Sequence, residues 1–132
     1  MGDVVFFDLE ATGFGNDSNI IQIGARGPGE DDATFSEFLM PRSGCEIQSA
    51  ASNVHGIYKT TAGRLYRNGE VLAGVHSQRQ GLDMFLDWIN DNFDTPVKVW
   101  PYGLKHSKMC QGFVNNIIIS ILLACGLQRL WI

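Results

Sequence analysis

The feature that most constrains this chain is a short apolar run that ends in two acidic residues one residue apart. The run is Val4–Phe7, and Asp8 and Glu10 follow it before a turn at Thr12 and Gly13. Such a run is too short for a helix and is typical of a buried β-strand covered on both faces. Because side chains alternate along a strand, Asp8 and Glu10 should point the same way, with Cα atoms roughly 6.5 to 7 Å apart.

Two carboxylates at this position predict a bound metal ion. Ionised carboxylates are costly to bury unless something pairs with them, and their oxygens suit hard divalent cations. Both side chains should reach one cation such as Mg²⁺ or Mn²⁺. We therefore predict that Asp8 and Glu10 are metal ligands.

Composition limits the classes of protein that this chain can belong to. Its 132 residues, 45% of them hydrophobic, fit a single domain over 1–132. The formal net charge of -4 argues against a general basic surface for nucleic acid, so any such contact should be local and metal-assisted. The three cysteines are odd in number and lack C-x-x-C spacing, which favours neither disulfides nor zinc. An intracellular location, cytoplasmic or nuclear, is expected.

Hydrophobic patterning predicts an α/β order of elements. The spacing between the first three strands is short, so they should form an antiparallel meander. Glycines punctuate a polar stretch in the middle of the chain, which is typical of a surface loop. After the opening strand, the predicted elements are strands at 20–26 and 34–40, a short helix within 49–57, a loop over most of 58–80, a helix at 81–93, a strand at 97–100 and a last helix at 113–127.

The helix at 81–93 has the clearest pattern. Its apolar stripe comprises Leu82, Phe85, Leu86, Ile89 and Phe93. Four aspartates occupy the opposite face and are interpreted as solvated, so they should not join Asp8 and Glu10. These are Asp83, Asp87, Asp91 and Asp94.

The last predicted helix is mostly apolar. Its longest apolar stretch, 117–125, is about half the length that crosses a bilayer, so a core helix is favoured over a membrane anchor. No membrane partner is expected. An alternative is self-association through this apolar C-terminal segment.

The motif around the acidic pair resembles a known family. Phe7–Gly13 is similar to the first motif of the DEDD superfamily of 3′-to-5′ exonucleases, in the group that includes the three-prime repair exonucleases. The resemblance covers about residues 3–100 and implies a ribonuclease H-like fold: a mixed β-sheet, antiparallel in its first three strands and flanked by helices. Further matching segments are Ile20–Ala25, Phe38–Pro41, Asn53–Ile57 in the "VHGI" form, and Leu82–Phe93.

The resemblance also implies a site and a substrate. In that family four acidic residues bind two metal ions that activate water, and a histidine acts as general base. By position, Asp8 would bridge both metals and Glu10 would hold the one that activates water. The backbone of Ala11 and Thr12 would lie against the 3′-terminal nucleotide of DNA or RNA. His55 would approach the same nucleotide, and a capping or packing role for His55 stays open.

The C-terminal part departs from the family pattern. The aspartate of the second motif should fall near Ser107, and a serine hydroxyl is a poor ligand for a divalent cation. From Thr95 to Ile132 there is no Asp or Glu, and no His follows His106. Two metal ions held by two carboxylates would keep much of their repulsion, so weak binding of a single Mg²⁺ or Mn²⁺ is expected.

Two interpretations follow from this departure. Residues 105–132 form a divergent apolar tail, as in a truncated product, or the domain is complete but degenerate. The chain is then a metal-dependent 3′-to-5′ exonuclease-type domain with impaired activity. Alternatively, it is a non-catalytic module that binds nucleic acid or a protein. A local group of basic side chains supports the second: Lys98, Lys105, His106 and Lys108.

Overall fold

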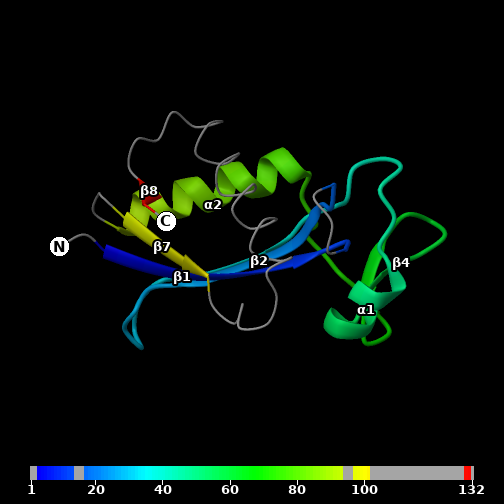
Figure 1. Cartoon of the computed structure of the whole chain (residues 1–132), viewed down its shortest axis with the longest axis horizontal. Coiled ribbons are helices and arrows are strands. Elements are labelled where there is room, and N and C mark those ends of the chain that lie inside the picture. Colours follow the sequence, from blue (N-terminus) through cyan, green and yellow to red (C-terminus); the bar gives the residue numbers. More distant parts are fainter. Residues whose placement is uncertain (1–2, 14–16, 94–96, 102–129, 132) are drawn as a thin grey trace.

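The computed structural model describes residues 3–13, 17–93, 97–101 and 130–131. This part of the chain is an α/β structure with a five-stranded sheet, a three-stranded sheet and two helices (Figure 1). Its elements are β1 (Asp3–Ala11), β2 (Ile20–Arg26), β3 (Thr34–Phe38), α1 (Ser49–His55), β4 (Ile57–Lys59), β5 (Leu65–Arg67), β6 (Glu70–Val71), α2 (Gln78–Asn92), β7 (Val97–Pro101) and β8 (Leu130–Trp131).

The larger sheet has the strand order β3-β2-β1-β7-β8. β1 pairs antiparallel with β2, and β2 pairs antiparallel with β3, so the predicted meander is confirmed. β7 lies parallel to β1, a geometry that needs a long crossover, and the chain between them includes α2. The third strand is shorter than predicted. It ends at Phe38, and Leu39 makes only an isolated bridge to His76.

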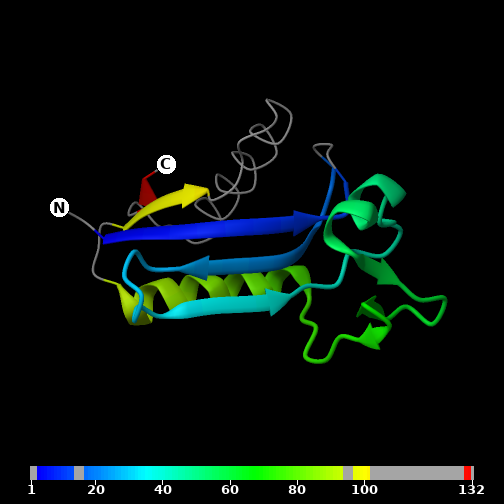
Figure 2. The same cartoon turned by 90° about the horizontal axis from the view of Figure 1, so that it is seen from below.

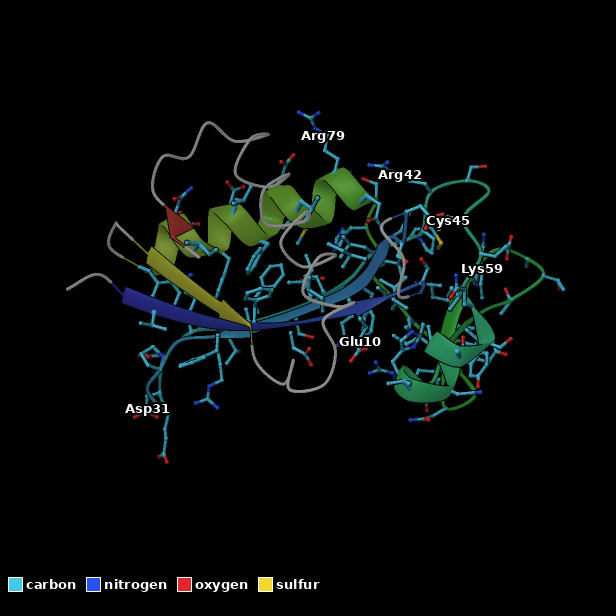
Figure 3. All side chains as sticks on the ribbon, in the orientation of Figure 1. Glu10, Asp31, Arg42, Cys45, Lys59 and Arg79 are labelled. Carbon is cyan, nitrogen blue, oxygen red and sulfur yellow. The ribbon has the colours of Figure 1, made fainter. Side chains whose placement is uncertain are left out.

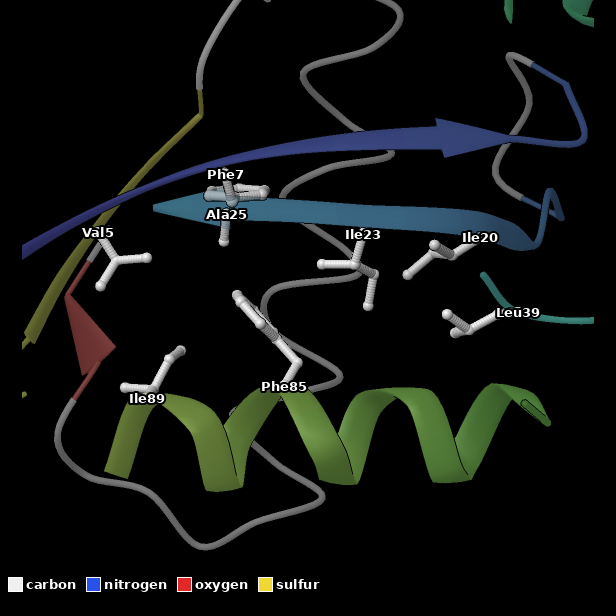
Figure 4. Packing of buried hydrophobic residues seen from close by; sticks show 8 residues of the cluster. All are labelled: Val5, Phe7, Ile20, Ile23, Ala25, Leu39, Phe85 and Ile89. Carbon is white, nitrogen blue, oxygen red and sulfur yellow. The ribbon is translucent and has the colours of Figure 1, made fainter. Parts of the chain in front are cut away.

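The main core lies between this sheet and α2, which runs along one face of it (Figure 2). Alternate residues of β1, Val5 and Phe7, pack with Phe85 and Ile89 of the helix (Figure 4). The predicted apolar stripe of the helix is therefore confirmed. The expectation that β1 is covered on both faces is not met within the described residues, because Asp8 on its other face is exposed.

α2 begins three residues before the predicted start at Gly81. The reason is a capping box at Ser77. The Gln80 amide donates to Ser77 Oγ over 3.2 Å, and the Ser77 amide donates to Gln80 Oε1 over 3.3 Å. Gly81 therefore lies inside the helix rather than at its start. It is buried in the helix where a Cβ atom would collide with the side chain of Leu39.

The predicted loop at 58–80 is wrong in part, because β4, β5 and β6 form a small antiparallel sheet. β5 and β6 are joined by Asn68 and Gly69, whose φ angles are 54° and 79°. Two positive φ angles define the tight hairpin turn that matches strand twist. These strands are too short to show periodicity. They are held by a second core cluster in which Leu65 and Ile57 contact Ile21.

The small sheet and α1 lie together at the end of the larger sheet toward which β1 runs (Figures 1 and 2). α1 confirms the short helix expected within 49–57. Neither described helix is long and apolar enough to cross a membrane. The predicted helix at 113–127, the apolar tail apart from β8, and the side chains of Lys98, Lys105, His106 and Lys108 lie outside what the structure describes.

Candidate functional site

Asp8 and Glu10 lie on the face of β1 opposite the α2 core. Strand alternation sends Val5, Phe7 and Leu9 into that core and leaves the two acids together on the other side. The register places Asp8 opposite Gly24 of β2 and Glu10 opposite Gln22. Asp8 is exposed and Glu10, labelled in Figure 3, is half-buried. The predicted pairing of these carboxylates on one face is thus present.

The environment of the pair disfavours its ionised form. Partial desolvation raises the pKa of Asp8, and the Leu9 backbone opposes this by hydrogen bonding. Desolvation also raises the pKa of Glu10, and repulsion by Asp8 adds to the effect, while the nearby Arg67 lowers it. A cation between the two carboxylates would relieve both causes.

No other described acidic side chain completes the pair. Neither Asp8 nor Glu10 is within ion-pair distance of a Lys or Arg in the described ranges. The same ranges contain no group of three or more His, Cys, Asp or Glu side chains arranged to hold a metal. The helix aspartates lie on α2, beyond the opposite face of the sheet, where Asp83 pairs with Arg79 at 3.8 Å. Their predicted solvated role is confirmed for Asp83, Asp87 and Asp91.

A hollow of about 440 Å³ lies beside Asp8. It runs over β1 and β2 toward the turn before β3, and its walls include Phe6, Arg26 and Thr34. Gly24, directly across from Asp8, has no side chain, and a Cβ atom there would meet only the Asp8 carbonyl at 4.0 Å. The absence of a side chain at this position keeps space open next to the carboxylate.

The turn after β1 is held rigidly by hydrogen bonds. The register shifts between Glu10 and Ala11, which marks a bulge. Thr12 is 2% exposed. Its amide donates to the Asn19 carbonyl over 2.9 Å, its carbonyl accepts from the Gln48 amide over 2.7 Å, and its Oγ1 accepts from the Asn19 amide over 2.9 Å. The Thr12 backbone is therefore buried and already hydrogen-bonded, and its predicted contact with a nucleotide stays a prediction.

His55 connects this turn to the small sheet. Its Nδ1 accepts from the Ile57 amide over 3.1 Å, so Nε2 carries the proton and donates to the Ala11 carbonyl at 3.0 Å. Desolvation lowers the pKa of His55, the hydrogen bond to Ala11 raises it, and Arg67 lowers it. Both ring nitrogens thus position backbone groups. The predicted contact of His55 with a substrate stays a prediction.

Two residues near the pair had not been predicted. Arg67 of β5 donates from Nη2 to Gln22 Oε1 over 2.9 Å and places its guanidinium carbon 5.4 Å from the centre of the Phe38 ring. Gln22 is the cross-strand neighbour of Glu10, so a positive charge stands close to the acids. The sequence signal was the Asn68-Gly69 hairpin dipeptide, which would have placed Arg67 on a strand.

Comparison with protein-family models found no matching family, and comparison with curated proteins found no similar sequence.

Proposed function

We propose that this chain is a ribonuclease H-like, metal-dependent 3′-to-5′ exonuclease-type domain that acts on nucleic-acid 3′ ends with impaired turnover. The observation that carries the proposal is the pairing of Asp8 and Glu10 on the face of β1 opposite the α2 core, with Asp8 beside a hollow. The antiparallel meander followed by a parallel fourth strand agrees with this fold.

The residues present fit one divalent cation. Mg²⁺ is commonly bound through one or two carboxylates, with water and substrate phosphate completing its shell. Asp8 and Glu10 offer two carboxylates, and both are free of ion pairs with described residues. With both ionised, Arg67 reduces the local charge of these three groups to minus one, which favours weak binding of a single ion. Two carboxylates do not fit a site for two metal ions.

The chain's own groups would position the substrate around that pair. A bound cation would polarise the scissile phosphate and lower the pKa of attacking water. Asp8 and Glu10 would hold the cation at the edge of the hollow, which has room for a nucleotide unit. The half-buried Ala11 backbone would lie against the terminal sugar. Since both nitrogens of His55 already bind backbone, His55 is not suited to accept a proton, and slow turnover is expected.

A second candidate is a non-catalytic module that binds nucleic acid or a protein. It is favoured by the small number of acids that could bind a metal: Asp8 and Glu10 on β1, and none between Thr95 and Ile132. In this case Asp8 and Glu10 would contribute to ligand binding through a cation without cleavage.

The test is a cleavage assay with single-stranded DNA and RNA labelled at the 5′ end, in Mg²⁺ or Mn²⁺. We expect slow shortening from the 3′ end that Asp8→Asn and Glu10→Gln each reduce at least tenfold, since each removes a metal ligand. Asp83→Asn, which removes an exposed acid on the far side of the sheet, is the matched control. Equal shortening by all four proteins would assign the activity to a contaminant. Binding without shortening would favour the second candidate.

A further inference from the structure

The small sheet presents an aromatic row on its outer face. Tyr58 of β4 and Tyr66 of β5 are direct cross-strand partners, with ring centroids 5.6 Å apart and planes inclined by 27°. Val71 of β6 is the next partner in the same row. Tyr58 is 40% exposed and Val71 is 54% exposed. The alternating residues Ile57 and Leu65 point the other way and are buried, so this sheet has one packed face and one open face.

The segment around this row is rich in basic residues, and one of them, Arg64, lies on its face. The segment 56–82 contains four Lys or Arg residues and a single acidic residue, Glu70, in a chain whose net charge is -4. The ladder between β4 and β5 continues one step, because the Thr60 amide donates to the Arg64 carbonyl over 2.7 Å. Strand alternation then sets Arg64, which is exposed, on the same face as Tyr66.

We propose that the outer face of the small sheet, formed by Tyr58, Tyr66, Val71 and Arg64, binds single-stranded nucleic acid by base stacking. The ligand class rests on the proposed function, whereas the binding itself needs no metal. Stacked aromatic rings offer flat surfaces that accept any base, and an adjacent guanidinium offers a contact for the phosphate backbone. The positions of this face carry the positive charge of Arg64 and no acidic residue, which favours a polyanion over an apolar protein partner.

The location of this face fits a role in holding the strand. β4 begins directly after the His55–Gly56 corner, and the His55 ring is hydrogen-bonded to the end of β1. The small sheet therefore lies at the end of the strand that carries Asp8 and Glu10 (Figure 1). Nucleic acid held here would be bound at the end of the larger sheet toward which β1 runs, and removal of the metal would leave the stacking contacts in place.

Cross-strand tyrosine pairs also stabilise hairpins, and this role must be separated from ligand binding. A purely structural pair would change the melting temperature when altered and would leave binding of an oligonucleotide unchanged. Arg64→Gln provides a second variant on the same face. Its side chain is exposed, so the substitution should not disturb folding.

The experiment measures fluorescence anisotropy of a labelled oligothymidylate of about 15 nucleotides, the upper range of site size for a small domain. It is done in EDTA at low salt, with the full chain. We expect Tyr58→Leu and Arg64→Gln each to weaken binding about fivefold or more, the lower limit for loss of one stacked base. The matched controls are Val54→Ala, an apolar residue 74% exposed on α1, and Arg79→Gln, whose side chain projects from α2 away from the sheet (Figure 3).

The outcomes separate this proposal from the nuclease proposal. Binding in EDTA that Tyr58→Leu and Arg64→Gln weaken, while Asp8→Asn leaves it unchanged, supports the stacking face even if no cleavage is seen. No binding by the wild-type protein, or binding by Tyr58→Leu and Arg64→Gln equal to that of the wild type, overturns it. A third result also overturns it: the wild-type protein self-associates and does not bind the oligonucleotide, and Tyr58→Leu abolishes the self-association. The face would then bind a second copy of the chain.

Discussion

The ring of His55 lies between two backbone groups that require opposite roles from its nitrogens. The Ile57 amide donates a hydrogen bond to Nδ1, and the Ala11 carbonyl accepts a hydrogen bond from Nε2. Only the neutral tautomer satisfies both, because a second ring proton would face the Ile57 amide. This residue therefore joins the end of β1 to β4 in a way that depends on its protonation state.

The lowered pKa of His55 sets the direction of a pH effect on stability. Below the usual value of 6.5, the unfolded chain binds a proton at this ring and the folded chain does not, so the free energy of unfolding falls as pH drops from 6.5 toward the folded pKa. His55→Gln should reduce this dependence. Urea unfolding between about pH 5 and pH 7.5 measures it.

Val54→Ala, an exposed neighbour in the same helix, is the control for that experiment. Identical pH slopes in the wild type and His55→Gln would show that the hydrogen bonds of the ring do not depend on its charge.

At the scale of elements, strands and helices with a strong local pattern were predicted correctly. Short strands that depend on contacts distant in sequence were not. β1, β2 and the apolar face of α2 followed from patterning, because each buries a regular set of side chains against one core. β5 and β6 have three and two residues, too few for a pattern, and depend on packing of Leu65. The Arg67–Gln22 contact spans 45 residues, so no local signal could have predicted it.

The junction of α2 with β3 gives a prediction at this scale. Gly81 faces Leu39, which is 0% exposed, and a Cβ atom at Gly81 would overlap the leucine side chain. We expect Gly81→Ala to destabilise the protein by about 1 to 2 kcal/mol, because overpacking costs about 1–3 kcal/mol and helix propensity offsets up to about 1 kcal/mol.

Denaturant midpoints would measure this change, with Asn90→Ala at an exposed position of α2 as control. Gly81→Ala more stable than the wild type would mean that Leu39 moves aside without cost.

At the scale of the whole molecule, the net charge of -4 conceals an uneven distribution. Acidic residues gather at Glu30–Asp32 and along α2, whereas the segment 56–82 is basic. The prediction that any nucleic-acid contact should be local followed from net charge, but its position required the fold. The placement of Asp8 and Glu10 on one face of a strand was predicted from seven residues of sequence, and their neighbours Gln22 and Arg67 were not.

Metal addition should change the stability of the whole domain. A cation that binds only the folded state stabilises it by RT ln(1 + [L]/Kd), which is about 1.4 kcal/mol at tenfold excess over Kd. Mn²⁺ should therefore raise the melting temperature at neutral pH. This increase should be lost as pH falls through the raised pKa values of Asp8 and Glu10.

Thermal melts with and without Mn²⁺ test this effect. Asp8→Asn and Glu10→Gln should abolish the increase, and Asp83→Asn should keep it. An increase that persists in Asp8→Asn would place the cation elsewhere on the protein.

The pleat of β1 places its residues on two faces, and the residues of the two faces have different roles. Val5 and Phe7 are fixed by the need to fill the interior, and replacing them would harm folding. Asp8 and Glu10 contribute nothing to that interior, and their desolvated charges work against the folded state at neutral pH. A chain kept only for its shape would gain by replacing them with neutral residues, so the two acids mark a purpose that folding alone does not explain.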